Sequence, residues 1–84
     1  MRNYAPEYPA GALENGVGGK VVVGYTVDAH GRPRDVHVVQ ASPPGTFDAA
    51  AMNAVSRWRY APVIVDGKPA AVPAKILIRF DPTK

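Results

Sequence analysis

The strongest constraint on the fold of this chain is an alternation of side chains over residues 20–28, KVVVGYTVD. In an extended strand this segment places Val21, Val23, Tyr25 and Val27 on one side, with residues such as Lys20 on the other. A period of two predicts a strand that is buried on one face only. Such a strand needs both a pairing partner and a covering layer, which the rest of the chain has to supply.

The pairing partner is predicted at residues 34–42, RDVHVVQAS, where Val36 and Val38 alternate with polar residues. The intervening AHGRP contains Gly31, which tolerates the backbone angles of a tight turn. The PPG of residues 43–45 then ends the segment. We therefore expect an antiparallel hairpin.

The covering layer is predicted to be a helix over residues 46–58. Thr46 is expected to be its N-cap, and Asp48 in the first turn complements the helix dipole. Pro62 closes the element. The apolar residues share one helical stripe, with spacings i, i+4, i+7, i+8 and i+11: Phe47, Ala51, Ala54, Val55 and Trp58.

The C-terminal part predicts a short hairpin and then a strand. Asp66 and Gly67 form a turn signal after the apolar Val63–Val65. Residues 75–80 alternate again, and Pro73 precedes them. Because proline is tolerated at the start of a strand or on an edge but not in a central strand, we expect this strand to be exposed along one side.

The first nineteen residues are rich in proline and glycine, which resist regular structure. We expect residues 1–7 to be a flexible segment and residues 8–84 to form one domain. A turn or two of helix around Ala10–Glu14 is compatible with the sequence, although Gly11 and Gly16 each cost it about 1 kcal/mol.

Together these elements predict an α+β fold. The architecture is a two-layer sandwich, in which one main helix packs on a three-stranded antiparallel sheet. Trp58, the largest apolar side chain of the helical stripe, is expected at the centre of the core. The predicted core consists of Val21, Val23, Tyr25, Phe47, Val55, Trp58 and Tyr60.

Size and composition exclude several classes of protein. Eighty-four residues make one small domain, which buries only about 60% of its unfolded surface. The absence of cysteine excludes disulfides and cysteine-based zinc sites. The net charge of +3 comes from cations spread along the chain rather than clustered. No apolar run approaches the ~20 residues of a membrane span.

Residues that could support catalysis or bind a metal are few. His30 and His37 lie on different elements, and with Asp28 and Asp35 they are better explained as a polar turn than as a metal site. The sequence GVGGK precedes a strand rather than a helix, so it does not match a phosphate-binding loop. We predict no catalytic residues, no metal site, no cofactor and no enzymatic activity.

Several motifs follow one another in a distinctive order along the chain. YP at residues 8–9 is followed by G-x-V-x-V-x-Y-x-V-D-x-x-G from Gly19 to Gly31. DVHVVQASPPGTFDAAAMNAVSRWRYAP and a last apolar strand complete the pattern. This order resembles the C-terminal domain of the TonB family of energy transducers in Gram-negative bacteria, and the resemblance covers about Tyr8 to Phe80. The weak helix formers in AGALENG and the VIVDGKPAAV hairpin depart from many members.

This resemblance implies a periplasmic domain that binds the TonB box, an N-terminal segment of outer-membrane transporters for siderophore-bound iron or cobalamin. It further implies that the full protein has an inner-membrane anchor and a proline-rich spacer, which we expect to precede this chain. In the full protein ExbB and ExbD would couple it to the proton gradient.

The predicted partner-binding site is the exposed edge of the last strand, where a peptide strand can be added through main-chain hydrogen bonds. The same edge could pair with a second copy. The predicted partner-binding residues are Lys75, Ile76, Leu77, Ile78, Arg79 and Phe80, with Tyr8 and Pro9.

Two other functions remain open from the sequence. One is a periplasmic interaction domain of another system, such as the C-terminal domain of TolA. The other is a small nucleic-acid-binding α+β module, suggested by the pI near 9.5. Against nucleic acid, no strand carries the aromatic pair that stacks bases, since Tyr25 is expected to face the core.

Overall fold

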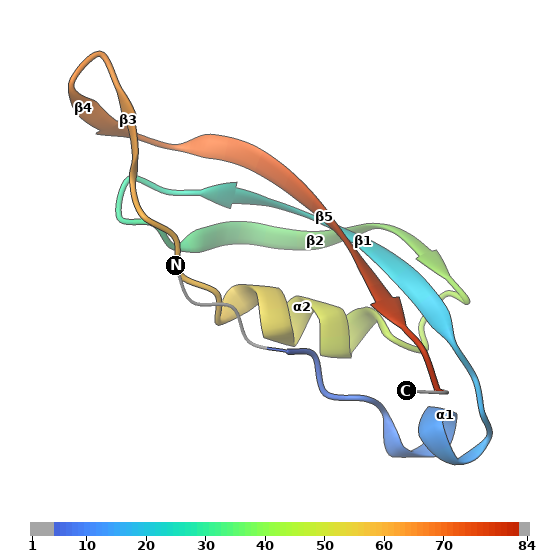
Figure 1. Cartoon of the computed structure of the whole chain (residues 1–84). Coiled ribbons are helices and arrows are strands. Elements are labelled where there is room, and N and C mark those ends of the chain that lie inside the picture. Colours follow the sequence, from blue (N-terminus) through green and yellow to red (C-terminus); the bar gives the residue numbers. More distant parts are fainter. Residues whose placement is uncertain (1–4, 83–84) are drawn as a thin grey trace.

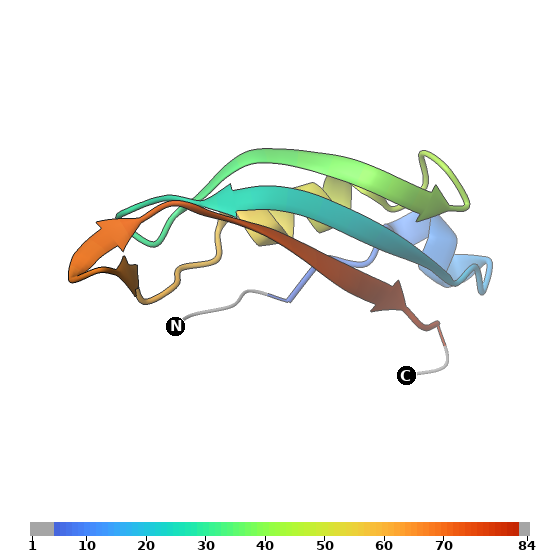
Figure 2. The same ribbon diagram turned by 90° about the horizontal axis from the view of Figure 1, so that it is seen from above.

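The computed structural model describes residues 5–82 and confirms the predicted α+β architecture (Figure 1). A three-stranded antiparallel sheet has the order β2-β1-β5, and a separate two-stranded sheet pairs β3 with β4. The main helix, α2, lies along one face of the larger sheet, which makes two layers (Figure 2). The elements in chain order are α1 (Ala10–Glu14), β1 (Gly19–Val27), β2 (Pro33–Ser42), α2 (Asp48–Ser56), β3 (Val63–Val65), β4 (Lys68–Ala70) and β5 (Val72–Phe80).

Strand β1 lies in the middle of the main sheet, and apolar residues alternate along most of its length. Its odd-numbered residues Val21, Val23, Tyr25 and Val27 are all buried, whereas Lys20 is exposed. The first turn is also as predicted, since Gly31 has a φ of +80°. Strand β5 extends three residues further toward its start than the predicted segment 75–80.

Helix α2 begins later than predicted. Phe47 occupies the N-cap position, and no side chain caps it. The Gly45 N–H instead donates to the Asp48 carboxylate at 3.0 Å, which closes the turn that leads into the helix. The prediction of Thr46 as the N-cap was therefore wrong, because Asp48 stabilises this turn from inside the helix.

The core forms between α2 and the sheet, and its fully buried large side chains are Val21, Val23, Phe47 and Val55. Trp58 is buried in the core as predicted, at 7% exposure, although Phe47 and Val55 of the same helical stripe are more deeply buried. At the start of α2, Phe47 is fully buried, and its ring stacks on Phe80 with centroids 4.3 Å apart. Trp58 instead contacts Tyr25 edge-on, with centroids 6.4 Å apart.

The chain that leaves α2 is fastened to the β1–β2 turn. The Tyr60 N–H donates to the Gly31 carbonyl at 2.8 Å, and the Tyr60 hydroxyl bonds the Tyr25 hydroxyl. Tyr60 was predicted to be a core residue, but it is only half-buried, because its ring closes the end of the core rather than filling it. The aromatic residues of WRYAP thus join the helix end to the first hairpin.

The N-terminal segment is held to the core by Tyr8. Its ring meets both Phe47 and Phe80 edge-on, each at a centroid distance of 5.6 Å. Its hydroxyl donates to the Val17 carbonyl at 2.5 Å, and the short helix α1 forms between these residues. The division into residues 1–7 and 8–84 remains a prediction, and residues 1–4 lie outside the described part.

The second hairpin also forms as predicted. Asp66 and Gly67 have φ values of +51° and +79°, which is the type I′ turn that a two-residue hairpin favours. The three apolar residues of β3 are exposed where this hairpin extends away from the main sheet (Figure 1). Among residues 5–82, neither helix has the length and hydropathy needed to cross a bilayer.

Candidate partner-binding edge

Strand β5 forms one edge of the main sheet, and the direction of its backbone groups follows from β1. Along a strand, the N–H and C=O of successive residues point alternately to opposite sides. The Asp28 N–H donates to the Arg32 carbonyl at 2.9 Å, so even-numbered residues of β1 face β2. The odd-numbered residues of β1 must therefore face β5.

This alternation divides the residues of β5 into those whose backbone groups face β1 and those whose backbone groups face away from the sheet. Ile76 and Ile78 lie opposite Val23 and Val21, so their backbone groups bond to β1. The backbone groups of Lys75, Leu77 and Arg79 consequently point away from the sheet. Within residues 5–82, no loop or N-terminal segment hydrogen-bonds to the N–H groups of these three residues.

Pro73 gives independent support for this assignment. It lies opposite Thr26 in β1, an even-numbered residue that faces β2. A proline has no N–H to donate, and at this position none is needed for pairing with β1. The exposed side of β5 predicted from Pro73 is thus the side on which Leu77 has its free N–H.

The opposite edge of the sheet is irregular. Strand β2 loses register with β1 twice, between Val22 and Val23 and again between Gly24 and Thr26. At the second shift Asp35 adopts a φ of +54°. Bulges bend a strand and interrupt its row of backbone groups, so β2 is a poor template for a further strand. By contrast, β5 pairs with β1 through nine consecutive residues with no shift.

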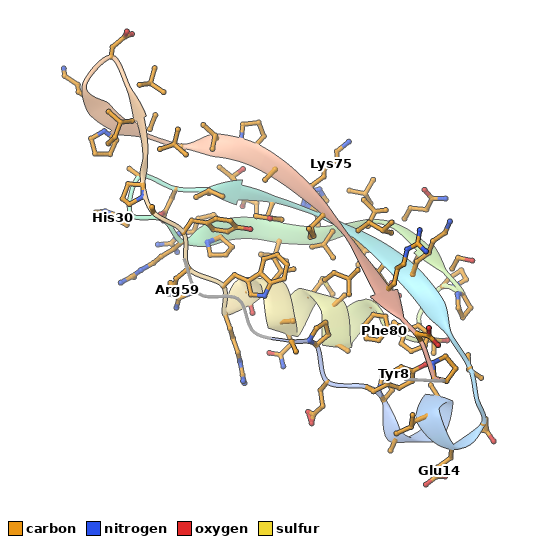
Figure 3. All side chains as sticks on the ribbon, viewed as in Figure 1. Tyr8, Glu14, His30, Arg59, Lys75 and Phe80 are labelled. Carbon is orange, nitrogen blue, oxygen red and sulfur yellow. The ribbon has the colours of Figure 1, made fainter. Side chains whose placement is uncertain are left out.

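The side chains of β5 give the two faces of its edge different character. Toward α2, Ile78 and Phe80 are buried and Ile76 is half-buried. On the uncovered face, Lys75 and Arg79 are exposed on either side of Leu77, which is 44% exposed. Figure 3 shows Lys75 directed away from the helix, whereas Phe80 points toward Tyr8.

The structure places Tyr8 close to this edge, but Pro9 lies farther along. A hollow of about 330 Å³ is lined by Tyr8 and Pro6 together with Arg79, Phe80 and Asp81. Burial of the Tyr8 hydroxyl, together with the nearby Asp81 carboxylate, raises the pKa of Tyr8. Pro9 instead lines a hollow against α2.

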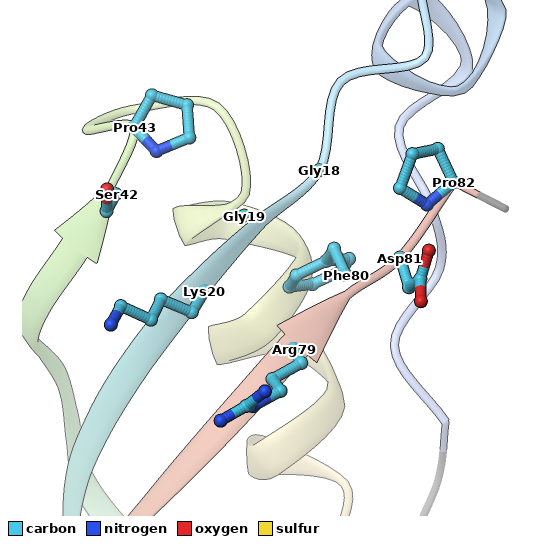
Figure 4. Close-up of a pocket in the computed structure, with 9 residues that line it drawn as sticks. All are labelled: Gly18, Gly19, Lys20, Ser42, Pro43, Arg79, Phe80, Asp81 and Pro82. Atoms are coloured by element: carbon cyan, nitrogen blue, oxygen red, sulfur yellow. The ribbon is translucent and has the colours of Figure 1, made fainter.

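The sequence did not predict that two cationic side chains lie side by side at the end of the uncovered face of the sheet. Lys20 of β1 lies directly opposite Arg79 of β5 and Ser42 of β2. These residues line a hollow of about 550 Å³, which Asp81 also lines, and both cationic side chains reach into the same region (Figure 4). Like charges directly opposite repel, so this pair favours a negative group nearby. Only the strand register, which the sequence pattern does not reveal, brings Lys20 and Arg79 together.

The residues considered for a metal site have structural roles in the first turn. The Asp28 carboxylate accepts hydrogen bonds from the Arg34 guanidinium at 2.8 Å and from the Arg32 and His30 N–H groups, each at 2.9 Å. The Arg34 bond and these backbone donors lower the pKa of Asp28 to about 2. Within the described residues, no group of three or more His, Asp and Glu side chains could hold a metal ion.

Comparison with known proteins identifies the family of this chain. A family model described as Gram-negative bacterial TonB protein C-terminal matches residues 4–82. Protein TonB of Xanthomonas campestris pv. campestris (strain B100) is 35% identical over 75 residues, which cover 89% of this chain and 34% of that protein. Protein TonB of Escherichia coli (strain K12) is 35% identical over 79 residues, which cover 93% of this chain and 31% of that protein.

A solved structure gives the same result for the fold. The solution NMR structure of the Pseudomonas aeruginosa TonB CTD superposes with a TM-score of 0.84 at 32% sequence identity, covering 96% of this chain and 82% of that one. The chain spans about a third or less of the length of the curated relatives. The match over nearly its whole length shows that this chain belongs to the TonB C-terminal domain family.

Proposed function

We propose that this domain binds the TonB box of outer-membrane TonB-dependent transporters by adding the peptide as a further strand to β5. The observation that supports this most directly is the regular, uncovered edge at Lys75, Leu77 and Arg79. Main-chain pairing makes few demands on side chains, so one edge can serve several transporters whose sequences differ.

The side chains around this edge support the proposal. An added strand would cover the half-buried Ile76 on the helix side and the exposed Leu77 on the other. Lys75 and Arg79 would attract acidic residues of the peptide. Such a short contact buries little surface, so we expect a Kd on the order of micromolar, which suits a complex that has to dissociate again.

In the full protein, this binding would couple the inner-membrane proton gradient to the uptake of siderophore-bound iron or cobalamin. The domain would act in the periplasm, joined to an inner-membrane anchor and working with ExbB and ExbD. These whole-protein roles rest on family membership, since this chain corresponds to about a third or less of its curated relatives.

The test is an NMR titration of the domain with a TonB-box peptide, using a scrambled peptide of the same composition as the control. We expect the shifts, and new protection from hydrogen exchange, at the amides of Lys75, Leu77 and Arg79. Shifts that cluster at His30, His37 or the 43–45 loop and spare residues 75–80 would contradict strand addition.

The same edge could also pair two copies of the domain. In that case the amides of Lys75, Leu77 and Arg79 would become protected as protein concentration rises, and the peptide would compete with this pairing. Sedimentation equilibrium with and without peptide distinguishes a dimer that uses β5 from one that uses another surface.

A further inference from the structure

Pro73 occupies the position on β5 where the next free N–H of the edge would be. Counting back from Arg79 and Leu77, the outward-facing residues are Lys75 and then residue 73, which cannot donate. The edge therefore offers N–H groups only at residues 75, 77 and 79, although the Pro73 carbonyl can still accept a bond.

We propose that Pro73 limits the length and register of any strand that pairs with β5. Pairing would extend from the Pro73 carbonyl to Arg79, so the bound segment would comprise about seven residues. This inference rests on the proposed function, because it concerns how much of a partner peptide the edge can hold.

The other end of the edge is also closed. Strand β5 stops at Phe80, so the outward-facing residues of the strand end with Arg79. Pro6 and Tyr8 of the N-terminal segment lie beside Arg79 and Phe80 at this end. A pairing strand thus meets an obstacle at both ends, and the interval between them sets its register.

The placement of Pro73 does not weaken the domain itself. Its partner Thr26 directs its backbone groups to β2, so a proline here removes no bond between β1 and β5. Pro73 therefore leaves the hydrogen bonds between β1 and β5 intact and removes a donor only from the free side of β5. Edge strands limit unwanted pairing in this way.

The adjoining hairpin has the same arrangement. Val65 and Lys68 close the type I′ turn, so Pro69, opposite Ile64, is the residue of β4 that would donate away from β3. Ile64 itself is 58% exposed. A long apolar edge running from this hairpin into β5 would invite aggregation, and the two prolines remove donors from it.

The experiment compares TonB-box peptides of seven residues with peptides lengthened by two or four residues at either end. For the wild-type domain, we expect lengthening to change Kd less than about twofold, because no further donor is available. For Pro73→Ala, Kd should be about two- to tenfold lower than for the wild-type domain, the effect of one added hydrogen bond. The amide that this substitution introduces at position 73 should then become protected from exchange.

Pro69→Ala is the matched control, since it also replaces a proline but leaves Pro73 in place. It should behave as the wild type in the peptide series. If it reproduced the effect of Pro73→Ala, backbone flexibility rather than the missing donor would explain the gain, and the inference would be overturned.

The remaining outcomes separate this inference from the proposed function. A wild-type domain that gains affinity from longer peptides, or a Pro73→Ala variant that binds the peptide without any such gain, overturns the inference alone. Failure of every peptide to bind β5 overturns the proposed function and the inference with it.

Discussion

The two edges of the main sheet differ in the one property that decides whether another strand can join them. Strand β2 loses register with β1 twice, and Asp35 turns its backbone into the left-handed region at the second shift. Strand β5 keeps register with β1 for nine consecutive residues and presents free N–H groups at Lys75, Leu77 and Arg79. One edge is disrupted along its length, whereas the other is regular but bounded by proline.

The difference shows that the bare edge of β5 is not a general feature of a small sheet. Uncovered edges carry a risk of aggregation, and bulges remove that risk at β2. At β5 the risk is reduced by Pro73 and by the cationic side chains of Lys75 and Arg79, whereas the backbone donors of residues 75, 77 and 79 are kept. This pattern is what we expect of an edge that has to accept a partner strand.

The largest effect should come from proline substitutions that test which residues of β5 direct their N–H groups toward β1 and which direct them outward. Ile78→Pro removes a bond to β1 and a side chain that is 8% exposed, and should lower the free energy of unfolding by about 3–5 kcal/mol. Leu77→Pro removes only an outward donor and should leave the domain folded while weakening peptide binding more than about tenfold. Urea denaturation and peptide titration measure the two effects.

A matched proline on the other edge serves as the control. Ala41 lies opposite Val21, whose backbone groups face β5, so the Ala41 N–H points away from β1. Ala41→Pro should therefore leave peptide binding unchanged in the folded variant. Loss of binding in Ala41→Pro together with normal binding in Leu77→Pro would assign the partner to the β2 edge instead.

Truncation of Trp58 should destabilise both edges together, because a single core supports the whole sheet. Trp58→Ala is expected to cost ~3–5 kcal/mol, a large part of the stability of so small a domain. Hydrogen exchange should show amides of β2 and β5 losing protection in parallel. A variant that melts cooperatively near the parent's temperature would mean that Trp58 contributes little to the core.

A smaller loss is expected at the turn that joins β1 to the irregular edge. Gly31 has a φ of +80°, and a Cβ at this position would collide with the Tyr60 carbonyl oxygen. Gly31→Val should cost about 1–3 kcal/mol from the backbone conformation, and the collision adds to this.

Gly45→Val is the matched comparison for the turn, since Gly45 has a φ of +81° but no atom within 4 Å of the added Cβ. Thermal unfolding should therefore show a larger loss for Gly31→Val than for Gly45→Val. Equal losses would indicate that the Tyr60 contact yields easily.

Acid should weaken the turn between β1 and β2, because it protonates Asp28. Its pKa is about 2 in the folded domain, below its ordinary value of 3.8, because the carboxylate bonds Arg34 and backbone donors. The stabilisation is therefore complete above pH 4 and is lost as the pH falls toward 2. In thermal melts, the wild type should lose its advantage over Asp28→Asn in this interval. A constant difference between the two proteins from pH 5 to pH 2 would contradict this role.

The smallest effect is expected from a side chain on the binding edge itself. Arg79→Ala leaves the N–H of residue 79 in place, so peptide affinity should fall less than about threefold at physiological salt. A loss comparable to that of Leu77→Pro would show that side-chain charge, rather than the backbone ladder, holds the peptide.

The sequence by itself determined the elements and their order. The alternation in residues 20–28, the helical stripe from Phe47 to Trp58 and the Asp66-Gly67 turn each depend on local periodicity or local backbone preference, so each was readable without tertiary information. Pro73 similarly marked β5 as an edge, because the lack of an N–H is a property of the residue itself.

Only the tertiary structure decided which backbone groups of that edge are free. The parity of Leu77 and Ile78 follows from the register with β1, and a shift of one residue would exchange their roles. The bulges of β2, the stacking of Phe47 on Phe80 and the docking of Tyr8 likewise arise from contacts between distant segments. Such contacts depend on how side chains fill the space between the layers, which the spacing of residues along one segment does not specify.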